Sequence, residues 1–368
     1  MKRYSLPLCL LLASFGSELV EAEEVPLASI NDAAAFLAGV ELPHQRDHPL
    51  ASTDDWSQHA RRMQREFESH RSRVLIPMSD WSREEIDAKL VEGSTVRYLF
   101  SGPDIIHAFH MFPTADEFIM CGLEPVGRIP SLETLTTANE GRALAEVRNA
   151  LGEIINFSFF RTKDMKEDLQ FSTFHGTTPI IMIFLKHSGQ YVRSVEFFEL
   201  AKDGTLVPRG HIAEGADAVR IEFSPRRVQQ SKSLTYFSSD LSNGGFKTSG
   251  FEDWLTKQPA GNAYLKAASY LMHSSWFSDV RDHLLDHSHQ VVQDDSGIPF
   301  RHFPSETWDA RLYGVYTGPI DLFEEYFQSD MRAAFQRGAE PLPFGTGYKW
   351  RPGQSNLMRM IRPDLVPE

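Results

Sequence analysis

The chain has 368 residues, of which 41% are hydrophobic and 24% charged, which suits one large α/β domain or two small ones. Its 37 basic and 50 acidic residues give a net charge of −13, and the basic residues form no block. This balance excludes binding to nucleic acid or to an anionic membrane by charge alone.

The first 22 residues have the pattern of an export signal. Lys2 and Arg3 form a basic start, residues 6–15 are apolar, and Val20 and Ala22 are small residues at the −3 and −1 positions of a cleavage site. The apolar run is too short to span a bilayer, and no later segment reaches about 18 uninterrupted apolar residues. The alternative is a buried N-terminal helix. We expect cleavage after residue 22 and a periplasmic or extracellular protein with no transmembrane segment in the mature chain.

Cleavage would leave Cys121 as the only cysteine and the net charge at −13. An intramolecular disulfide is then impossible, so stability must come from an ordinary core. The position of Cys121 between Met120 and Gly122, at the end of an apolar run, favours a buried inert thiol over a nucleophile.

Residues 23–93 are expected to form a helical arm packed on the core. A short helix is predicted at 32–39 and a longer one at 54–70, where Trp56, Ala60, Met63 and Phe67 make one apolar stripe. His59 and His70 fall off that stripe and are expected to be solvated. Ser82 and Glu85 have capping-box spacing and predict a helix from 82 to about 91. Whether residues 54–92 form a lid stays open.

Residues 94–368 are expected to form a single α/β domain with an extended C-terminal tail. Helices are predicted at 105–112, 130–160 and 278–289. Strands are predicted at 96–100, 117–123, 178–185, 191–200, 218–224, 233–238, 291–293 and 308–316, and residues 264–272 favour a strand over a helix. Alternating strands and helices predict a layered α/β fold with a Rossmann-like core, and short connections between some strands make the sheet mixed, partly antiparallel.

Acidic side chains follow several of these strands. The candidate pocket, at the carboxyl edge of the sheet, comprises Ser101, Asp104, Glu124, Asp240, Asp294, Asp295 and His273. Carboxylates that converge with histidine suit a divalent cation that activates water, and Asp104, Glu124, His107 and His110 are the candidate ligands. The alternative is that these acids cap helices and tie turns together.

A dinucleotide site is a separate hypothesis for the same turns. Gly102 precedes Glu124 by 22 residues, close to the separation between a Rossmann glycine turn and its ribose-binding acid. Pro103 and Asp104 stand where bare backbone should approach a pyrophosphate, and the carboxylate of Asp104 would repel that group. We therefore expect no nucleotide cofactor.

Other catalytic patterns are weak. His283 and His287 have the spacing of two zinc ligands on a helix, but no glutamate general base lies between them and their acidic neighbours indicate a solvated face. No G-x-S-x-G sequence occurs, so a serine-hydrolase elbow is not predicted.

Several strings occur together in one order: YLFSGPD (98–104), CGLEPVG (121–127), NFSFFRTKDM (156–165), YFSSDLSN (236–243), SYLMH (269–273), QDDSGIP (293–299) and LPFGTGY (342–348). In this combination the chain resembles an uncharacterised family of exported bacterial proteins. The resemblance implies export and a bacterial source, and it implies no activity, cofactor or catalytic residue.

Three functions remain open from the sequence, and the third of them, structural assembly in the envelope, predicts an exposed apolar patch on one face. The first is binding of a small molecule or an envelope protein at an acidic pocket, which is favoured because no complete catalytic set is visible. The second is a metal-assisted hydrolase that uses the same acidic residues. Whether the protein is an enzyme is left undecided.

Overall fold

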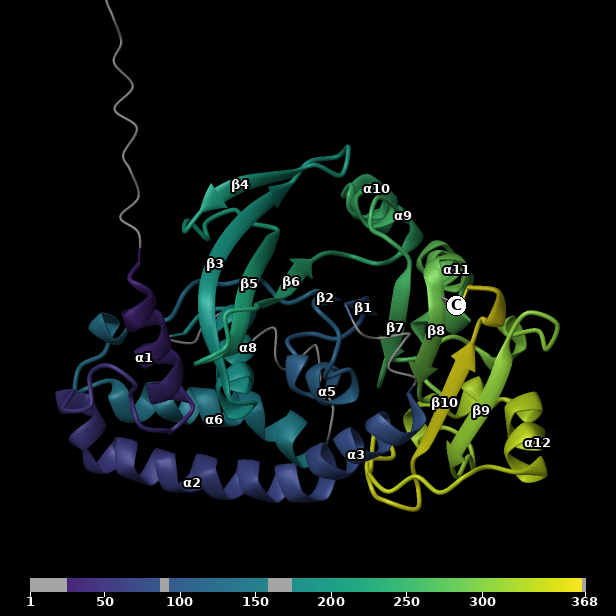
Figure 1. The fold of residues 1–368 in the computed structure, drawn as a ribbon, viewed down its shortest axis with the longest axis horizontal. Helices are drawn as coiled ribbons and strands as arrows, with labels where there is room; N and C mark the ends of the chain where they lie inside the picture. The colour runs from purple at the N-terminus through teal and green to yellow at the C-terminus, as the bar shows by residue number, and fades with distance from the viewer. Residues whose placement is uncertain (1–24, 87–92, 158–173, 366–368) are drawn as a thin grey trace, which may run out of the picture.

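The computed structural model describes residues 25–86, 93–157 and 174–365 (Figure 1). One sheet of ten strands runs through these ranges in the order β4-β3-β5-β6-β2-β1-β7-β8-β10-β9. The strands are β1 (Thr95–Tyr98), β2 (Glu117–Gly122), β3 (Gln190–Leu200), β4 (Leu206–Gly210), β5 (Ala218–Pro225), β6 (Lys232–Ser238), β7 (Gly261–Leu265), β8 (Ser288–Gln293), β9 (Asp309–Gly314) and β10 (Asn356–Ile361).

The middle of the sheet is parallel and its two margins are antiparallel. β6, β2, β1, β7 and β8 pair in parallel, with Val96 of β1 opposite Phe118 of β2 on one side and Asn262 of β7 on the other. β5, β3 and β4 extend one margin in antiparallel pairs, and β10 runs antiparallel between β8 and β9. The prediction of a layered α/β fold with a mixed sheet is confirmed.

The chain fills the parallel part of the sheet outward from β1. It adds β2 and later β6 on one side, then crosses to the other side and adds β7 and β8. The direction of winding therefore reverses at β1, which makes the carboxyl ends of β1, β2 and β7 a topological switch point. Ligand sites of open α/β sheets lie at such a point.

Helices cover both faces of this sheet. They are α1 (Leu27–Leu37), α2 (Asp54–His70), α3 (Ile76–Glu85), α5 (Ile105–Met111), α6 (Glu140–Phe157), α8 (Thr177–His187), α9 (Asn243–Thr248), α10 (Phe251–Thr256), α11 (Ser278–His287) and α12 (Ser329–Arg337). Shorter helical segments lie at 49–52, 71–75, 132–134, 271–273, 275–277, 300–302, 321–326 and 363–365. Figure 1 shows α2, α6 and α8 on one side of the sheet and α9, α10 and α11 on the other.

The side chains of β2 point alternately to the two faces of the sheet, and each face has its own hydrophobic cluster. Phe118 and Met120 point into the cluster under α1, α2, α5 and α8, whereas Ile119 and Cys121 point into the cluster under α9 to α12. Successive side chains of a strand face opposite sides of the sheet, so a strand that is buried on both faces is apolar throughout. Cys121 is fully buried, and burial raises the pKa of its thiol well above the usual range.

The N-terminal helices belong to the first of these clusters, where Met63 and Phe67 of α2 pack. α2 spans 54–70 as predicted, but the expectation that His59 and His70 are solvated was wrong because both are buried. The Nε2 of His59 lies 2.7 Å from the backbone oxygen of Leu37. These histidines reach α1 and α5, which a helix considered by itself does not reveal.

The predicted helix start at Ser82 was also wrong. Ser82 lies in the last turn of α3, where its hydroxyl donates to the backbone oxygen of Met111 at 2.5 Å. Residues 87–92, which the prediction included, lie outside the described residues. Capping-box spacing alone therefore did not locate a helix start, because the serine serves a tertiary hydrogen bond.

Two further expectations need correction. The apolar run at 178–185 is the buried helix α8, with Pro179 in its first turn, where proline is tolerated. A run that is apolar on every side has no period by which to tell helix from strand. The tail is not merely extended, because its residues 356–361 form β10 inside the sheet.

None of the helices in the described ranges is both long and apolar enough to cross a bilayer.

Candidate functional site

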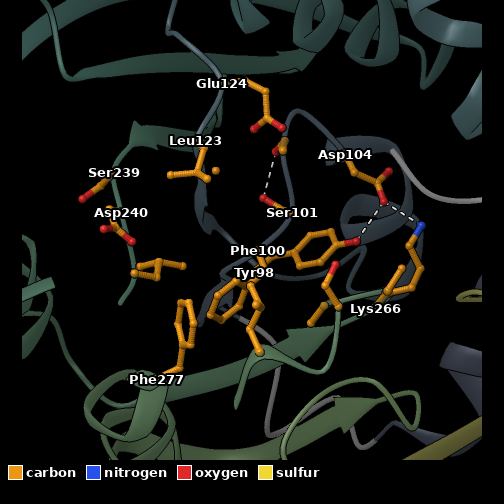
Figure 2. Close-up of a pocket in the computed structure, with 17 residues that line it drawn as sticks. Tyr98, Phe100, Ser101, Asp104, Leu123, Glu124, Ser239, Asp240, Lys266 and Phe277 are labelled. Carbon is orange, nitrogen blue, oxygen red and sulfur yellow. Dashed lines mark hydrogen bonds and ion pairs between the residues drawn. The ribbon is translucent and has the colours of Figure 1, made fainter. Parts of the chain in front are cut away.

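Four turns meet at the switch point, and each follows one strand of the parallel region. Residues 99–104 follow β1, 123–124 follow β2, 239–241 follow β6 and 266–271 follow β7. Together they line a pocket with a cavity of about 120 Å³ (Figure 2). Its lining residues are Tyr98, Phe100, Ser101, Gly102, Asp104, Gly122, Leu123, Glu124, Ser239, Asp240, Leu241, Lys266, Ala267, Ala268, Ser269, Leu271 and Phe277.

The backbone of this pocket is unusual. Among the described residues, four that are not glycine have positive φ, and these are Phe100 (64°), Ala267 (51°), Ser269 (54°) and Tyr270 (54°). The first three line the pocket and the fourth follows directly. A side chain in the left-handed region raises the conformational energy, and such residues cluster at functional sites. The turns after β1 and β7 are therefore held in shapes that local sequence preference disfavours.

Asp104 is the centre of a buried charged network. Its Oδ2 lies 2.7 Å from the Nζ of Lys266 and accepts a hydrogen bond from the hydroxyl of Tyr98 at 2.9 Å (Figure 2). Its Oδ1 lies 2.7 Å from the Nδ1 of His107 and also caps the first turn of α5. Burial by itself would raise the pKa of Asp104, but the adjacent His107 and Lys266 outweigh it and lower that pKa to about 2.

The network continues into the helical layer through two histidines. The Nε2 of His107 lies 3.1 Å from the Nε2 of His70 in α2. Burial lowers the pKa of both imidazoles, and for His70 the neighbouring His107 adds to the lowering. Both imidazoles are therefore uncharged near pH 7. Burial also lowers the pKa of Lys266, and the adjacent Asp104 opposes that lowering, while the Nζ of Lys266 lies 2.8 Å from the Nδ1 of His107.

Glu124 occupies the end of β2, where its side chain is 1% exposed. The hydroxyl of Tyr236 donates to its backbone oxygen at 3.0 Å and lies 3.3 Å from its Oε2. Gly122 makes room for this carboxylate, because a Cβ at Gly122 would lie 2.3 Å from Oε2 and 3.1 Å from the Cα of Gly102. The turn after β2 thus approaches the turn after β1 this closely because position 122 carries no side chain.

Two other predicted residues line the pocket but have local hydrogen-bonding roles. The Oγ of Ser101 donates to the backbone oxygen of Gly102 at 2.8 Å. The carboxylate of Asp240 accepts from the backbone N–H and the hydroxyl of Ser242, both at 2.8 Å, at the start of α9. Asp240 remains exposed to solvent at the rim.

The expected pocket has to be corrected for Asp294, Asp295 and His273, which are not among its lining residues. Asp294 accepts hydrogen bonds from the backbone N–H groups of Ala267 and Ser296 at 3.0 and 2.9 Å. It therefore fixes the backbone of the turn after β7 without lining the pocket. Asp295 accepts from the hydroxyl of Tyr270 at 2.5 Å and from the side-chain amide of Asn356. His273 lies edge-on to Tyr270.

Of the four candidate metal ligands, Asp104 and His107 contact each other, but the set does not converge on one point. In the described part of the chain, no three His, Cys, Asp or Glu side chains are arranged to hold a metal ion. The ammonium of Lys266 contacts Asp104 where a cation would have to bind, and the Nδ1 of His110 instead lies 2.9 Å from the hydroxyl of Ser79. This geometry gives no support to the metal-assisted hydrolase. His283 and His287 stack on each other, and neither joins the pocket.

Sequence reasoning missed Lys266 and the apolar wall. Lys266 is 3% exposed and is the only basic side chain among the lining residues. A signal was present, because a single lysine interrupts the run from Ala263 to Met272, which is otherwise apolar or small except for Ser269. Phe277 was missed because a short helical segment, 275–277, brings it to the pocket from outside any strand.

Comparisons of this chain with protein-family models, with curated proteins and with solved structures find no match.

Proposed function

We propose that the protein binds a small molecule in the switch-point pocket, and that the ligand donates hydrogen bonds to the carboxylates there. The observation that carries this proposal is the pocket itself, at the carboxyl ends of four parallel strands. It combines three acidic side chains, one basic side chain and an apolar wall. The left-handed backbone of Phe100, Ala267 and Ser269 supports it, because strain of this kind is retained where a site requires it.

The charge of the pocket limits the class of ligand. Asp104 is already compensated by Lys266, whereas Asp240 adds a negative charge that is exposed at the rim. An anion that entered would be repelled, and a hydroxyl or ammonium group would be attracted. The ligand is therefore uncharged or cationic, and it carries O–H or N–H donors together with an apolar part.

Thermal unfolding of the mature chain tests this proposal. Panels of polyols, amines, carboxylates and phosphates are compared, and we expect only polyols or amines to raise the midpoint, by about 2 °C or more near saturation. Leu271→Trp puts a larger side chain into the lining of the pocket and should abolish the shift, whereas Leu322→Trp, at a residue 74% exposed elsewhere, should preserve it. The proposal fails if no compound shifts the midpoint or if Leu271→Trp leaves the shift intact.

We further propose that the protein acts outside the cytoplasm, on the strength of the signal pattern at residues 1–22. Mass spectrometry of the protein recovered from a periplasmic fraction should give the mass of residues 23–368. Recovery of the full 368-residue chain from the cytoplasm would contradict export.

A further inference from the structure

The buried floor of the pocket already has hydrogen bonds within the protein. The hydroxyl of Tyr98 donates to Asp104, and the ammonium of Lys266 pairs with the same carboxylate. The Oγ of Ser101 donates to the backbone oxygen of Gly102. A ligand group gains little at these positions, because it would replace hydrogen bonds that are already made. Selection of a ligand therefore falls to the part of the lining that solvent reaches.

Asp240 is an exposed carboxylate in that part of the lining. Figure 2 shows it on the opposite side of the pocket from Asp104 and Lys266. Its two oxygens each accept one hydrogen bond from Ser242, one from the backbone N–H and one from the hydroxyl, which leaves part of the roughly four acceptor sites of a carboxylate open. Both donors are uncharged, and no basic side chain in the described ranges pairs with Asp240. A ligand cation at the rim would therefore gain a charge-assisted hydrogen bond.

The other large side chains of the accessible lining are apolar, and two of them are aromatic. Phe100, Leu123, Leu271 and Phe277 line the pocket and are exposed or half-buried. The rings of Phe100 and Phe277 meet edge-on, with their centroids 6.0 Å apart. Aromatic rings offer apolar surface, and their faces attract ammonium groups. This wall suits a ligand that joins an apolar body to a cation.

Phe100 stands in this wall at a conformational cost. Its φ is 64°, in the left-handed region that glycine adopts without strain. Two positions later the same turn has a glycine, Gly102, at a φ of 53°. A strained residue is retained where its side chain is required, so the ring of Phe100 has a role in the pocket that glycine could not fill.

The size of the cavity limits the apolar body. Its volume is about 120 Å³, and a cavity of ~150 Å³ in another protein holds benzene. We propose that the pocket takes a small ammonium ligand, with an apolar body of about one ring against Phe100 and Phe277 and its ammonium on the carboxylate of Asp240, as in an arylalkylamine. The inference rests on the proposed function and narrows its ligand to a cation.

Isothermal titration calorimetry on the mature chain tests the ligand class. The probes are 2-phenylethylamine, the neutral 2-phenylethanol, the anion phenylacetate, and ethylamine, which has no ring. We expect 2-phenylethylamine to bind about tenfold more tightly than the alcohol, because it gains a charge-assisted hydrogen bond, and about tenfold more tightly than ethylamine, because its ring buries apolar surface. Raising the ionic strength from about 0.01 M to about 0.15 M should weaken the amine and leave the alcohol unchanged.

Asp240→Asn keeps the shape of the side chain and an oxygen that can accept from the N–H of Ser242. We expect the affinity for 2-phenylethylamine to fall about tenfold, to the level of the alcohol, whose affinity stays the same. Asp309→Asn removes the same charge at an exposed residue that does not line the pocket, and it should change neither affinity.

Equal affinity for the amine and the alcohol in the unaltered chain overturns the inference, and so does tighter binding of phenylacetate. An amine preference that survives in Asp240→Asn overturns it as well. The comparison of amine with alcohol uses the unaltered chain, so it decides the matter even if the variant fails to fold. If polyols raise the unfolding midpoint while 2-phenylethylamine does not bind, the inference fails and the proposed function stands.

Discussion

Lys266 and Asp104 form an ion pair from which water is excluded, since their side chains are 1% and 2% exposed. Charges so deeply buried are tolerated because each has several partners: Asp104 also accepts from Tyr98 and contacts His107. Such a pair contributes little net stability compared with an apolar replacement, but removing one partner leaves the other charge without compensation. The pair therefore defines the shape of the pocket floor more than it stabilises the fold.

Lys266→Met should lower the free energy of unfolding by about 3–5 kcal/mol, because Asp104 would remain buried and charged. The double variant Lys266→Met, Asp104→Leu should recover most of that loss. Urea unfolding measures both. Lys247→Met removes a more exposed ion pair with Asp279, which solvent screens, and should change stability only slightly. A loss in Lys266→Met no larger than that of Lys247→Met would contradict this account of the pair.

At the scale of elements, β10 decides how the sheet ends. It lies between β8 and β9, so both neighbours depend on it for their backbone hydrogen bonds. Met358 and Met360 of β10 are fully buried in the cluster under α9 to α12. β10, near the C-terminal end of the described residues, thus connects β8 and β9, which lie far before it in the sequence.

A chain that ends at Gly353 should lose cooperative unfolding, because β8 and β9 would each present unpaired backbone groups and the cluster would lose its methionines. Circular dichroism during heating measures the transition, and a chain that ends at Leu365 is the control. A cooperative transition at an unchanged midpoint in the shorter chain would show that β10 is dispensable.

For the whole molecule, buried histidines set the response to acid. Burial lowers the pKa of His59, His110 and His273 to about 4 and that of His187 and His283 to about 3, against 6.5 for the unfolded chain. The unfolded state therefore binds more protons than the folded state as the pH falls below 6.5, and stability falls with it. Asp294 opposes this trend. Burial raises its pKa to about 6, so just below that pH the folded state binds more protons at this carboxyl than the unfolded state does. Its contribution to folding stability is therefore lost as the pH rises through about 6.

We expect the unfolding midpoint to fall steeply between about pH 6.5 and about pH 4, since five histidines lose stability in this window and Asp294 offsets roughly one of them. His59 and His110, with pKa values of about 4, each contribute on the order of 3 kcal/mol to the change. Calorimetry across this range checks the slope. A midpoint that is constant or rises toward pH 4 would mean that these imidazoles are accessible to protons in the folded state.

Some parts of this structure followed from local sequence. β2, β3, β5 and β6 were predicted within a few residues, because β-branched and aromatic runs bounded by turns carry their own signal. The dipeptide Asp203-Gly204 is typical of a turn, and Gly204 has the positive φ (74°) that such a turn requires. The acids that follow strands β1, β2 and β6 could be identified as a group because parallel strands end at one edge of a sheet.

The sequence by itself determined the fold class, the alternation of strands and helices and the edge of the sheet that holds the pocket, because these depend on hydrophobic period and turn residues that act over a few positions. Only the tertiary structure decided which side chains share the pocket. Lys266 pairs with Asp104 across 162 positions of the chain, and β10 enters the sheet beside β8, which precedes it by more than 60 residues. No local pattern encodes such pairings, since they depend on which strands lie side by side in the folded sheet.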